Sequence, residues 1–234
     1  MTEPAPAASA AAPSIRLRPR LAMAAQLVPP GAVIADIGTD HAFLPVYLVQ
    51  TGHCPRAIAA DIGEGPLRNA AKTVERAGLR DSVELRLSDG FGSFSPGEAD
   101  CWILTGMGGT LMARLLERTA WLCHTTLVLQ PMRHAWEARA WLLSHGFMIE
   151  QELACFEAGR AYGALRAIAS KGNTPAGLSY LYIGELRRCP HPAAAELLRQ
   201  ERALLAARVR GLERIGREGV ELDRLRAVLE EWEL

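Results

Sequence analysis

The stretch DIGTDHAFLP, residues 36–45, begins where the apolar run 32–37 ends. An acidic residue and a glycine, followed by a second Asp beside a His, are typical of a strand that runs into a ligand-binding turn. This stretch therefore predicts an α/β protein with a ligand-binding site at the end of its first strand.

Similar apolar runs recur along the chain, separated by segments with helical spacing. Because the runs are apolar throughout, they predict parallel strands covered on both faces. Two later extended segments with a short connection predict a closing antiparallel pair, and Pro19 predicts the start of a short helix that ends before Pro29. The expected parallel strands are 32–37, 57–61, 83–87, 101–105 and 126–129, the expected helices 43–50, 66–77, 109–118 and 135–144, and the antiparallel pair 147–154 and 162–169.

The two ends of the chain differ from this pattern. Residues 1–13, rich in Ala and Pro, predict a disordered tail, and residues 14–185 a single ligand-binding domain. Residues 186–234 form a long, charged segment rich in helix-favouring residues, with apolar residues spaced along one helical seam and glycines at 216 and 219. This pattern predicts an antiparallel, coiled-coil-like helical hairpin.

Composition narrows the function classes. Lys plus Arg equals Asp plus Glu at 26 each, so a polyanionic partner would have to meet a local patch. Five scattered cysteines without a C-x-x-C pair argue against a disulfide framework and a zinc cluster, and favour a reducing cytoplasm. No apolar run is long enough for a membrane helix. We expect neither a metal nor a membrane partner; the oligomeric state is open, and a monomer is compatible with the sequence.

The loops that follow the predicted strands carry the candidate site. In an open α/β sheet, ligands bind beyond the carboxyl ends of the strands. A dinucleotide would need G-x-G-x-x-G after the first strand, and here that loop has one glycine, Gly38, between Asp36 and Asp40. Two carboxylates repel a pyrophosphate and favour a cationic cofactor without phosphate, such as S-adenosylmethionine. Asp61 could then accept the ribose hydroxyls, and Asp89 the adenine amino group.

Five motifs in this order and spacing resemble the bacterial tRNA (adenine-22-N1)-methyltransferase family: DIGTDHAFLP, AIAADIGEGPLRNA, LRLSDGF, ILTGMGG and LVLQP. The resemblance runs from about residue 17 to the end and is strongest over 29–133. It implies a Rossmann-like class I methyltransferase sheet with helices on both faces, a C-terminal helical hairpin, and methyl transfer from S-adenosylmethionine to N1 of adenine 22 in tRNA. This chain has Asp61 where many relatives have Glu.

The resemblance and the loop chemistry together assign candidate roles. Adenine N1 is nucleophilic when neutral, so the site must mainly place the base and stabilise the cationic product. We expect Asp40 and His41 to face the incoming base. The other expected sites are for the cofactor (Asp36, Gly38, Asp61, Ile62, Asp89, Gly90, Gly106), for the target base (Met107, Gly108, Gly109) and for tRNA (Arg16, Arg18, Arg20, Arg133, Arg208, Arg210).

Simpler roles stay open for each residue. Asp36, Asp40 and Asp61 could cap helices, His41 could be structural, Met107 could serve packing and the glycines only a tight turn. The arginines could be solvated surface, and the tryptophans are expected to serve packing. Two other functions also remain: a methyltransferase of this fold acting on a protein or small molecule, and a non-catalytic binding module that keeps the cofactor pocket. A nicotinamide dehydrogenase is disfavoured because its glycine pattern is absent.

Overall fold

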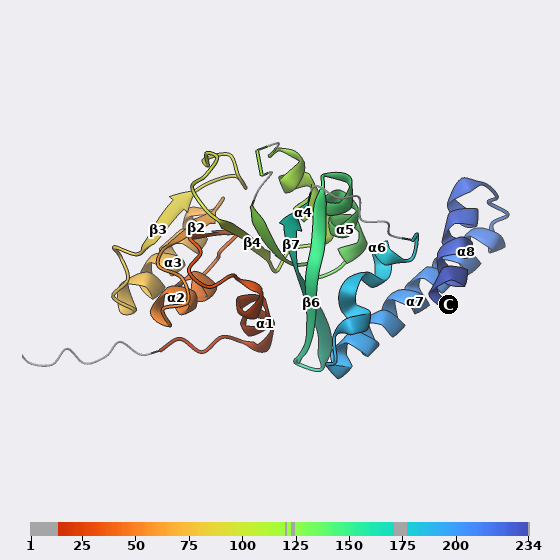
Figure 1. Ribbon diagram of the computed structural model, residues 1–234, viewed down its shortest axis with the longest axis horizontal. Coiled ribbons are helices and arrows are strands. Elements are labelled where there is room, and N and C mark those ends of the chain that lie inside the picture. The colour runs from red at the N-terminus through yellow and green to blue at the C-terminus, as the bar shows by residue number, and fades with distance from the viewer. Residues whose placement is uncertain (1–13, 120, 123–124, 171–176, 234) are drawn as a thin grey trace, which may run out of the picture.

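The computed structural model describes residues 14–119, 121–122, 125–170 and 177–233; the expected tail 1–13 and Cys123 lie outside these residues. Its strands form one seven-stranded sheet in the order β3-β2-β1-β4-β5-β7-β6 (Figure 1). The strands are β1 Ile34–Ile37, β2 Ala57–Asp61, β3 Val83–Leu87, β4 Cys101–Thr105, β5 Thr126–Gln130, β6 Phe147–Glu157 and β7 Arg160–Ala169.

The first five strands are parallel, and β7 pairs antiparallel to both β5 and β6. This confirms the predicted sheet and its closing hairpin. Chain order reverses direction at β1, which lies between β2 and β4, so Asp36 stands opposite Ala59 and Ile103. The carboxyl ends of these strands therefore meet at one edge, at the switch point where open α/β sheets bind ligands.

Helices cover both faces of the sheet, as its uniformly apolar strands require. One face, with Ile34 and Ile103, packs against α1, α2 and α3; the other, with Trp102 and Leu104, packs against α4 and α5. As predicted, α1 begins with Pro19 in its first turn. The bounds are α1 Pro19–Leu27, α2 Phe43–Gln50, α3 Glu64–Arg76, α4 Gly109–Glu117 and α5 Ala135–Ser144.

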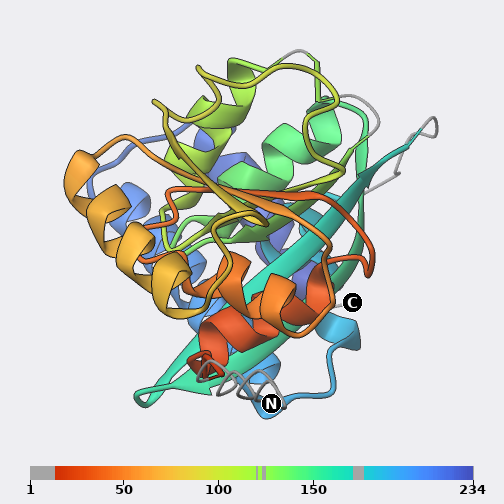
Figure 2. The ribbon, with the colours of Figure 1, turned by 90° about the vertical axis from the view of Figure 1, so that its left-hand side faces the viewer.

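The β6–β7 hairpin is much longer than the other strands and crosses the molecule obliquely (Figure 2). Side chains alternate between its faces. Tyr162 and Ala164 belong to the core under α1, whereas Ala161 and Ala154 belong to a separate cluster that includes Ala193 at the start of α7. The hairpin therefore carries α1 on one face and the C-terminal helices on the other.

The C-terminal hairpin consists of α7 Pro192–Arg214 and α8 Val220–Glu233, and it lies at the opposite end of the molecule from β3 (Figure 1). It begins six residues after the boundary expected at 186. Its first turns pack on the sheet, so α7 is not an independent unit, while Leu205 and Val209 pack against Leu222 and Leu225 of α8.

A short segment that the sequence did not predict joins the sheet to this hairpin: α6 Tyr180–Ile183 and the 3-10 helix η1 Gly184–Arg188. A buried ion pair holds it. Arg139 donates two hydrogen bonds to Glu152, at 2.8 and 3.2 Å, and two more to the carbonyls of Leu181 and Tyr182. A Cβ at Gly184 would lie 2.5 Å from the Glu152 carboxylate, so this approach needs glycine.

Candidate active site

Asp36 lies at the carboxyl end of β1, and only 3% of its surface is exposed. The Thr39 hydroxyl donates a 2.7 Å hydrogen bond to Oδ2, while Oδ1 is buried without a hydrogen-bond partner among the described residues. Burial raises the pKa of this carboxyl to about 6, against the lowering effect of Thr39 and together with the repulsion from Asp61. Asp36 is therefore a buried acceptor with one unused oxygen, and a cationic partner would favour its charged form.

Asp61 connects the first two loops. Its Oδ1 accepts a 2.9 Å bond from the Gly63 amide, and its Oδ2 accepts a 3.3 Å bond from the Asp40 amide. The amides of Gly38 and Thr39 also bond the carbonyl of Ala60 on β2. The DIGTD turn is consequently held against the end of β2, and the Asp61 carboxylate is near enough to Asp36 to repel its charge.

These bonds correct the capping interpretations. The N-cap of α2 is Ala42, in the left-handed region, and the N-cap of α3 is Gly63; neither helix has a side-chain cap bond. Asp36 and Asp40 therefore cap no helix, and Asp61 holds the loops instead.

The candidates further along the edge have different surroundings. Ile62 is 70% exposed directly after β2. Asp89 is exposed and forms a 3.2 Å ion pair with Arg118, so its carboxylate already has one partner. Gly90 is buried with a positive φ, and a Cβ there would meet Leu115 at 2.6 Å, so it has a packing role.

The TGMGG loop between β4 and α4 lies next to the DIGTD turn. A Cβ on Gly38 would lie 3.0 Å from the Met107 side chain, so these two loops touch. A Cβ on Gly109 would lie 2.0 Å from the His134 carbonyl oxygen, a position that excludes any side chain. The Gly109 amide bonds the Arg133 carbonyl, and the Met132 amide bonds the Met107 carbonyl. The loops after β4 and β5 therefore form one unit.

Gln130, which was not predicted as a site residue, connects this unit to the N-terminal helix. Its side chain is fully buried at the end of β5, and Oε1 accepts bonds from the Gly106 amide at 3.2 Å and from Arg20 at 3.4 Å. Arg20 also contacts the Met132 sulfur, stacks over Tyr162, and its backbone amide bonds Glu157. The LVLQP motif contains Gln130, but the sequence of this apolar run does not indicate which groups the Gln130 side chain binds.

Asp40 and His41 lie on the outer side of the first loop. Asp40 has φ +52°, its side chain is 64% exposed, and its Oδ2 lies 3.7 Å from His41 Nε2. The His41 ring stacks on Phe43 at 5.1 Å between centroids. The pair is solvent-accessible beside the loop that carries Asp36 and contacts Asp61.

The candidate RNA-binding arginines are dispersed. Arg20 borders the TGMGG loop, and a Cβ on Gly108 would lie 3.8 Å from the Arg133 side chain, so these two arginines flank the edge. Arg16 and Arg18 are exposed before α1. Arg208 pairs with Glu221 on the C-terminal hairpin, and Arg210 is exposed there, away from the site.

The sequence is similar to those of known methyltransferases. Residues 17–165 match the family described as a methyltransferase domain. A Bacillus subtilis tRNA (adenine(22)-N(1))-methyltransferase is 39% identical over 157 residues, a match that covers 66% of this chain and 66% of that relative, just under two thirds of its length.

Solved structures extend the likeness to nearly the whole chain. The structure of the B. subtilis m1A22 tRNA methyltransferase TrmK is 29% identical, covers 93% of this chain and 94% of its own, and has a TM-score of 0.76. A Streptococcus pneumoniae protein in complex with S-adenosyl-L-methionine is 31% identical over 90% of this chain and 98% of its own, with a TM-score of 0.76. The chain belongs to the tRNA (adenine-22-N1)-methyltransferase family.

The residues of this methyltransferase fit the cofactor that its family uses. The unpartnered Asp36 oxygen suits the ammonium or sulfonium of S-adenosylmethionine, and Asp61 and the exposed Ile62 adjoin it where a nucleoside could lie. Among the described residues no group of three or more His, Cys, Asp or Glu side chains could hold a metal, and no helix there is long and apolar enough to cross a membrane.

Proposed function

We propose that this methyltransferase transfers the methyl group of S-adenosylmethionine to N1 of adenine 22 in tRNA. The observation that carries the proposal is the carboxyl edge of β1, β2 and β4. There the buried Asp36 carboxyl has an oxygen without a hydrogen-bond partner among the described residues, and the TGMGG loop touches the DIGTD turn through Met107 and Gly38. The names of the relatives agree with this substrate.

The reaction needs placement more than proton transfer. Bound S-adenosylmethionine supplies an electrophilic methyl group; the N1 lone pair forms the new N–C bond as the S–C bond breaks, and the electron pair stays on sulfur. The base becomes cationic. Because the Asp40 carboxylate is accessible beside the loop, it stabilises this developing charge, and His41 orients the base from its stack on Phe43.

Binding of the target also requires that adenine leave the folded RNA, because N1 lies on the Watson–Crick edge. The glycines at 106 and 108 allow close approach of the base, and Met107 provides an apolar contact. Arg20 and Arg133 flank this loop and would hold the phosphates of the displaced nucleotide. Arg16, Arg18, Arg208 and Arg210 would make more distant contacts.

The test is methyl transfer from labelled S-adenosylmethionine to unmodified tRNA with adenine at position 22, beside the same tRNA with guanine there. We expect incorporation only into the adenine transcript. With Asp40→Asn, which tolerates the left-handed backbone, we expect kcat to fall about ten-fold because one charge near the product is lost.

Asp81→Asn is the matched control. Asp81 is exposed on the turn before β3, at the amino ends of the parallel strands, so this substitution should leave kcat unchanged. Equal labelling of the two transcripts would contradict methylation at position 22. No labelling of either, with S-adenosylmethionine still bound, would instead favour a protein or small-molecule substrate.

A further inference from the structure

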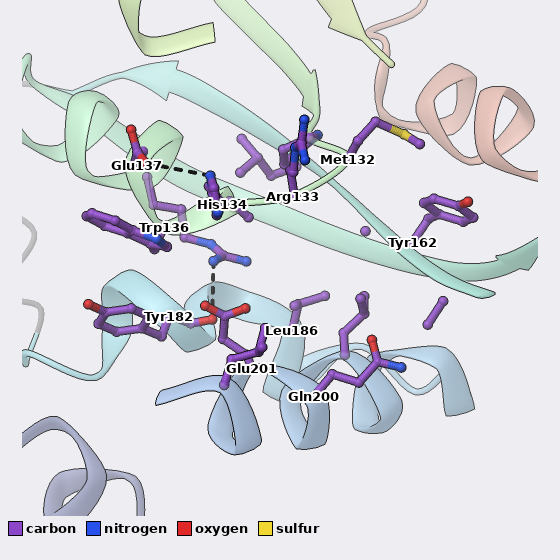
Figure 3. A pocket seen from close by; sticks show the side chains of 18 of the residues that line it. Met132, Arg133, His134, Trp136, Glu137, Tyr162, Tyr182, Leu186, Gln200 and Glu201 are labelled. Carbon is purple, nitrogen blue, oxygen red and sulfur yellow. Dashed lines mark hydrogen bonds and ion pairs between the residues drawn. The ribbon is translucent and has the colours of Figure 1, made fainter. Parts of the chain in front are cut away.

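A cavity of about 650 Å³ lies outside the cofactor edge, between the β5–α5 loop, β7 and α7 (Figure 3). Met132 and Tyr162 lie at one end, and Trp136 and Tyr182 at the other. Two of its lining residues, Arg133 and Arg208, have a role in the proposed function as contacts for RNA phosphates, and the cavity itself has none. Its volume is in the range of pockets that bind nucleotides and other small ligands.

The walls of the cavity suit a flat aromatic ligand. Trp136 and Tyr182 stack on each other with centroids 5.8 Å apart and planes at 28°. Leu204 of α7 lines the cavity although 66% of it is exposed, which is unusual for a leucine so close to a packed core. Aromatic and aliphatic surfaces of this kind stack with nucleobases.

Three polar side chains of α7 line the cavity: Gln200, Glu201 and Arg208. Arg208 is paired with Glu221 of α8, so Gln200 and Glu201 are left to accept hydrogen bonds. Among the described residues, Glu201 has no ion pair or hydrogen bond, and it is half-buried. Burial raises the pKa of its carboxyl, against the opposing influence of Arg139 and His134. The Gln200 amide nitrogen is occupied by Glu196, so its oxygen is left to accept, and Figure 3 shows that oxygen turned towards the cavity.

Arg133 connects the cavity with the active site. It lines the cavity, and the same side chain lies 3.8 Å from the position of a Cβ on Gly108 in the base-binding loop. No ion pair within the described part of the chain engages it, and it is exposed. One phosphate bound here would therefore lie between two nucleotides, one at the TGMGG loop and one in the cavity.

We infer that this cavity binds a guanine of the substrate tRNA that neighbours the target adenine, with Glu201 accepting from its Watson–Crick edge. Among the four standard bases, guanine alone offers two adjacent donors on that edge, N1–H and the N2 amino group. A carboxylate accepts both at once, as it does from a guanidinium, and such charge-assisted pairs are strong and geometrically specific. Adenine, cytosine and uracil each offer a single donor group and would leave one carboxylate oxygen unpaired.

This inference rests on the proposed function, because it assigns the cavity to the same RNA. It adds a source of selectivity that the cofactor edge lacks. The enzyme would recognise adenine by its position beside a guanine that is read separately, not by the base in the active site alone.

The experiment replaces single guanines of the D-arm by inosine, which lacks the N2 amino group, and measures kcat/KM for methylation of each transcript. For the wild-type enzyme we expect inosine at one position to lower kcat/KM about ten-fold, the size of a lost hydrogen bond to a charged group. Glu201→Gln should lower kcat/KM about ten-fold with guanine at that position, and should then show no further loss with inosine.

Two variants accompany Glu201→Gln. Glu213→Gln removes a charge from the same helix outside the cavity, where Glu213 pairs with Arg226, and should keep the inosine effect. Leu204→Trp fills the cavity from its exposed edge and should lower kcat/KM without discriminating inosine, which preserves the test if Glu201→Gln unfolds.

The outcomes separate the two proposals. A wild-type enzyme that methylates adenine 22 but tolerates inosine at every guanine overturns the guanine site alone. Inhibition by free guanosine monophosphate, without any inosine-sensitive position, would identify a nucleotide site unrelated to the tRNA and would also overturn it. A wild-type enzyme that methylates no tRNA overturns the proposed function, and the guanine site with it.

Discussion

Asp36 is a carboxyl group that the fold holds in an unfavourable place. It is buried beside Asp61, with one hydrogen bond to one of its two oxygens. Its folded pKa, about 6, is above the value of 3.8 for a free Asp carboxyl. Between these two pH values the folded protein keeps a proton that the unfolded chain loses, so stability decreases as pH rises, and above pH 6 the full penalty remains.

Asp36→Asn should therefore stabilise the cofactor-free protein at pH 7.5, by an amount on the order of 1–3 kcal/mol, because the charge is removed and Thr39 can still donate to the amide oxygen. The gain should shrink as pH falls from 7.5 to 5. Denaturant unfolding of both proteins across this range measures it.

The same substitution should weaken binding of S-adenosylmethionine, since the cationic cofactor loses its charged partner. Wild-type affinity should rise with pH up to about 6 and then level off, whereas the variant should be flat. Thr39→Val is the matched control, because it keeps the charge and removes only the hydroxyl. A variant less stable at pH 7.5 and unchanged in affinity would contradict this account.

At the scale of elements, the β4–α4 and β5–α5 loops act as one piece. The Gly109–Arg133 and Met132–Met107 bonds join them, and Gln130 extends the connection to Arg20 on α1. Movement of one loop would move the TGMGG loop and the Arg133 side chain together.

Gly109→Ala tests this connection. Its Cβ would lie 2.0 Å from a backbone oxygen, which no side-chain rotation relieves, so the loops must separate. We expect a loss of roughly 1–3 kcal/mol in the free energy of unfolding and a larger fall in methyl transfer than in cofactor affinity. Gly108→Ala has 3.8 Å of space and φ −74°, and should be almost neutral in unfolding experiments. Equal effects of the two substitutions would argue against the steric explanation.

The sequence predicted most elements because their signals are local. Apolar runs of about five residues mark β1, β2 and β4; β2 ends in Asp61, and a glycine directly follows β1 and β4. The helices α2 and α5 have the predicted bounds. The α6–η1 segment could not be predicted, since it depends on the buried Arg139–Glu152 pair, whose partners are 13 residues apart.

The candidate site shows the same division. Asp36, Asp61 and Gly109 lie together because parallel strands place their carboxyl ends at one edge, a rule that sequence order alone supplies. Gln130 and Trp136 were not predicted as site residues, because their partners come from α1, α6 and α7 and no periodicity in the sequence indicates such contacts.

At the scale of the whole molecule, the C-terminal hairpin completes the cavity wall. Val228 of α8 is fully buried in a cluster that also holds Tyr182 and, at its edge, Trp136. The packing of α8 thus supports the aromatic end of the cavity from behind.

Val228→Asp should loosen α8, because it places a charge in that cluster, and should lower kcat/KM for tRNA about ten-fold or more while leaving affinity for S-adenosylmethionine unchanged. Val220→Asp introduces the same group at a residue that is 85% exposed at the start of α8, and should change neither. Isothermal titration with the cofactor and tRNA kinetics give the two values. A parallel loss of both would show that the hairpin supports the whole fold.

On the side of α1, the long β6–β7 hairpin carries Glu157, which accepts a hydrogen bond from the Arg20 amide. On its other side, the hairpin packs against the first turns of α7. These parts therefore share a single support that projects beyond the five parallel strands. Fraying of this pair of strands would release the arginine at the base loop and the C-terminal helices in the same event, while Asp36 and Asp61 stay in place. We therefore predict that mild heating reduces methyl transfer to tRNA before it reduces binding of S-adenosylmethionine.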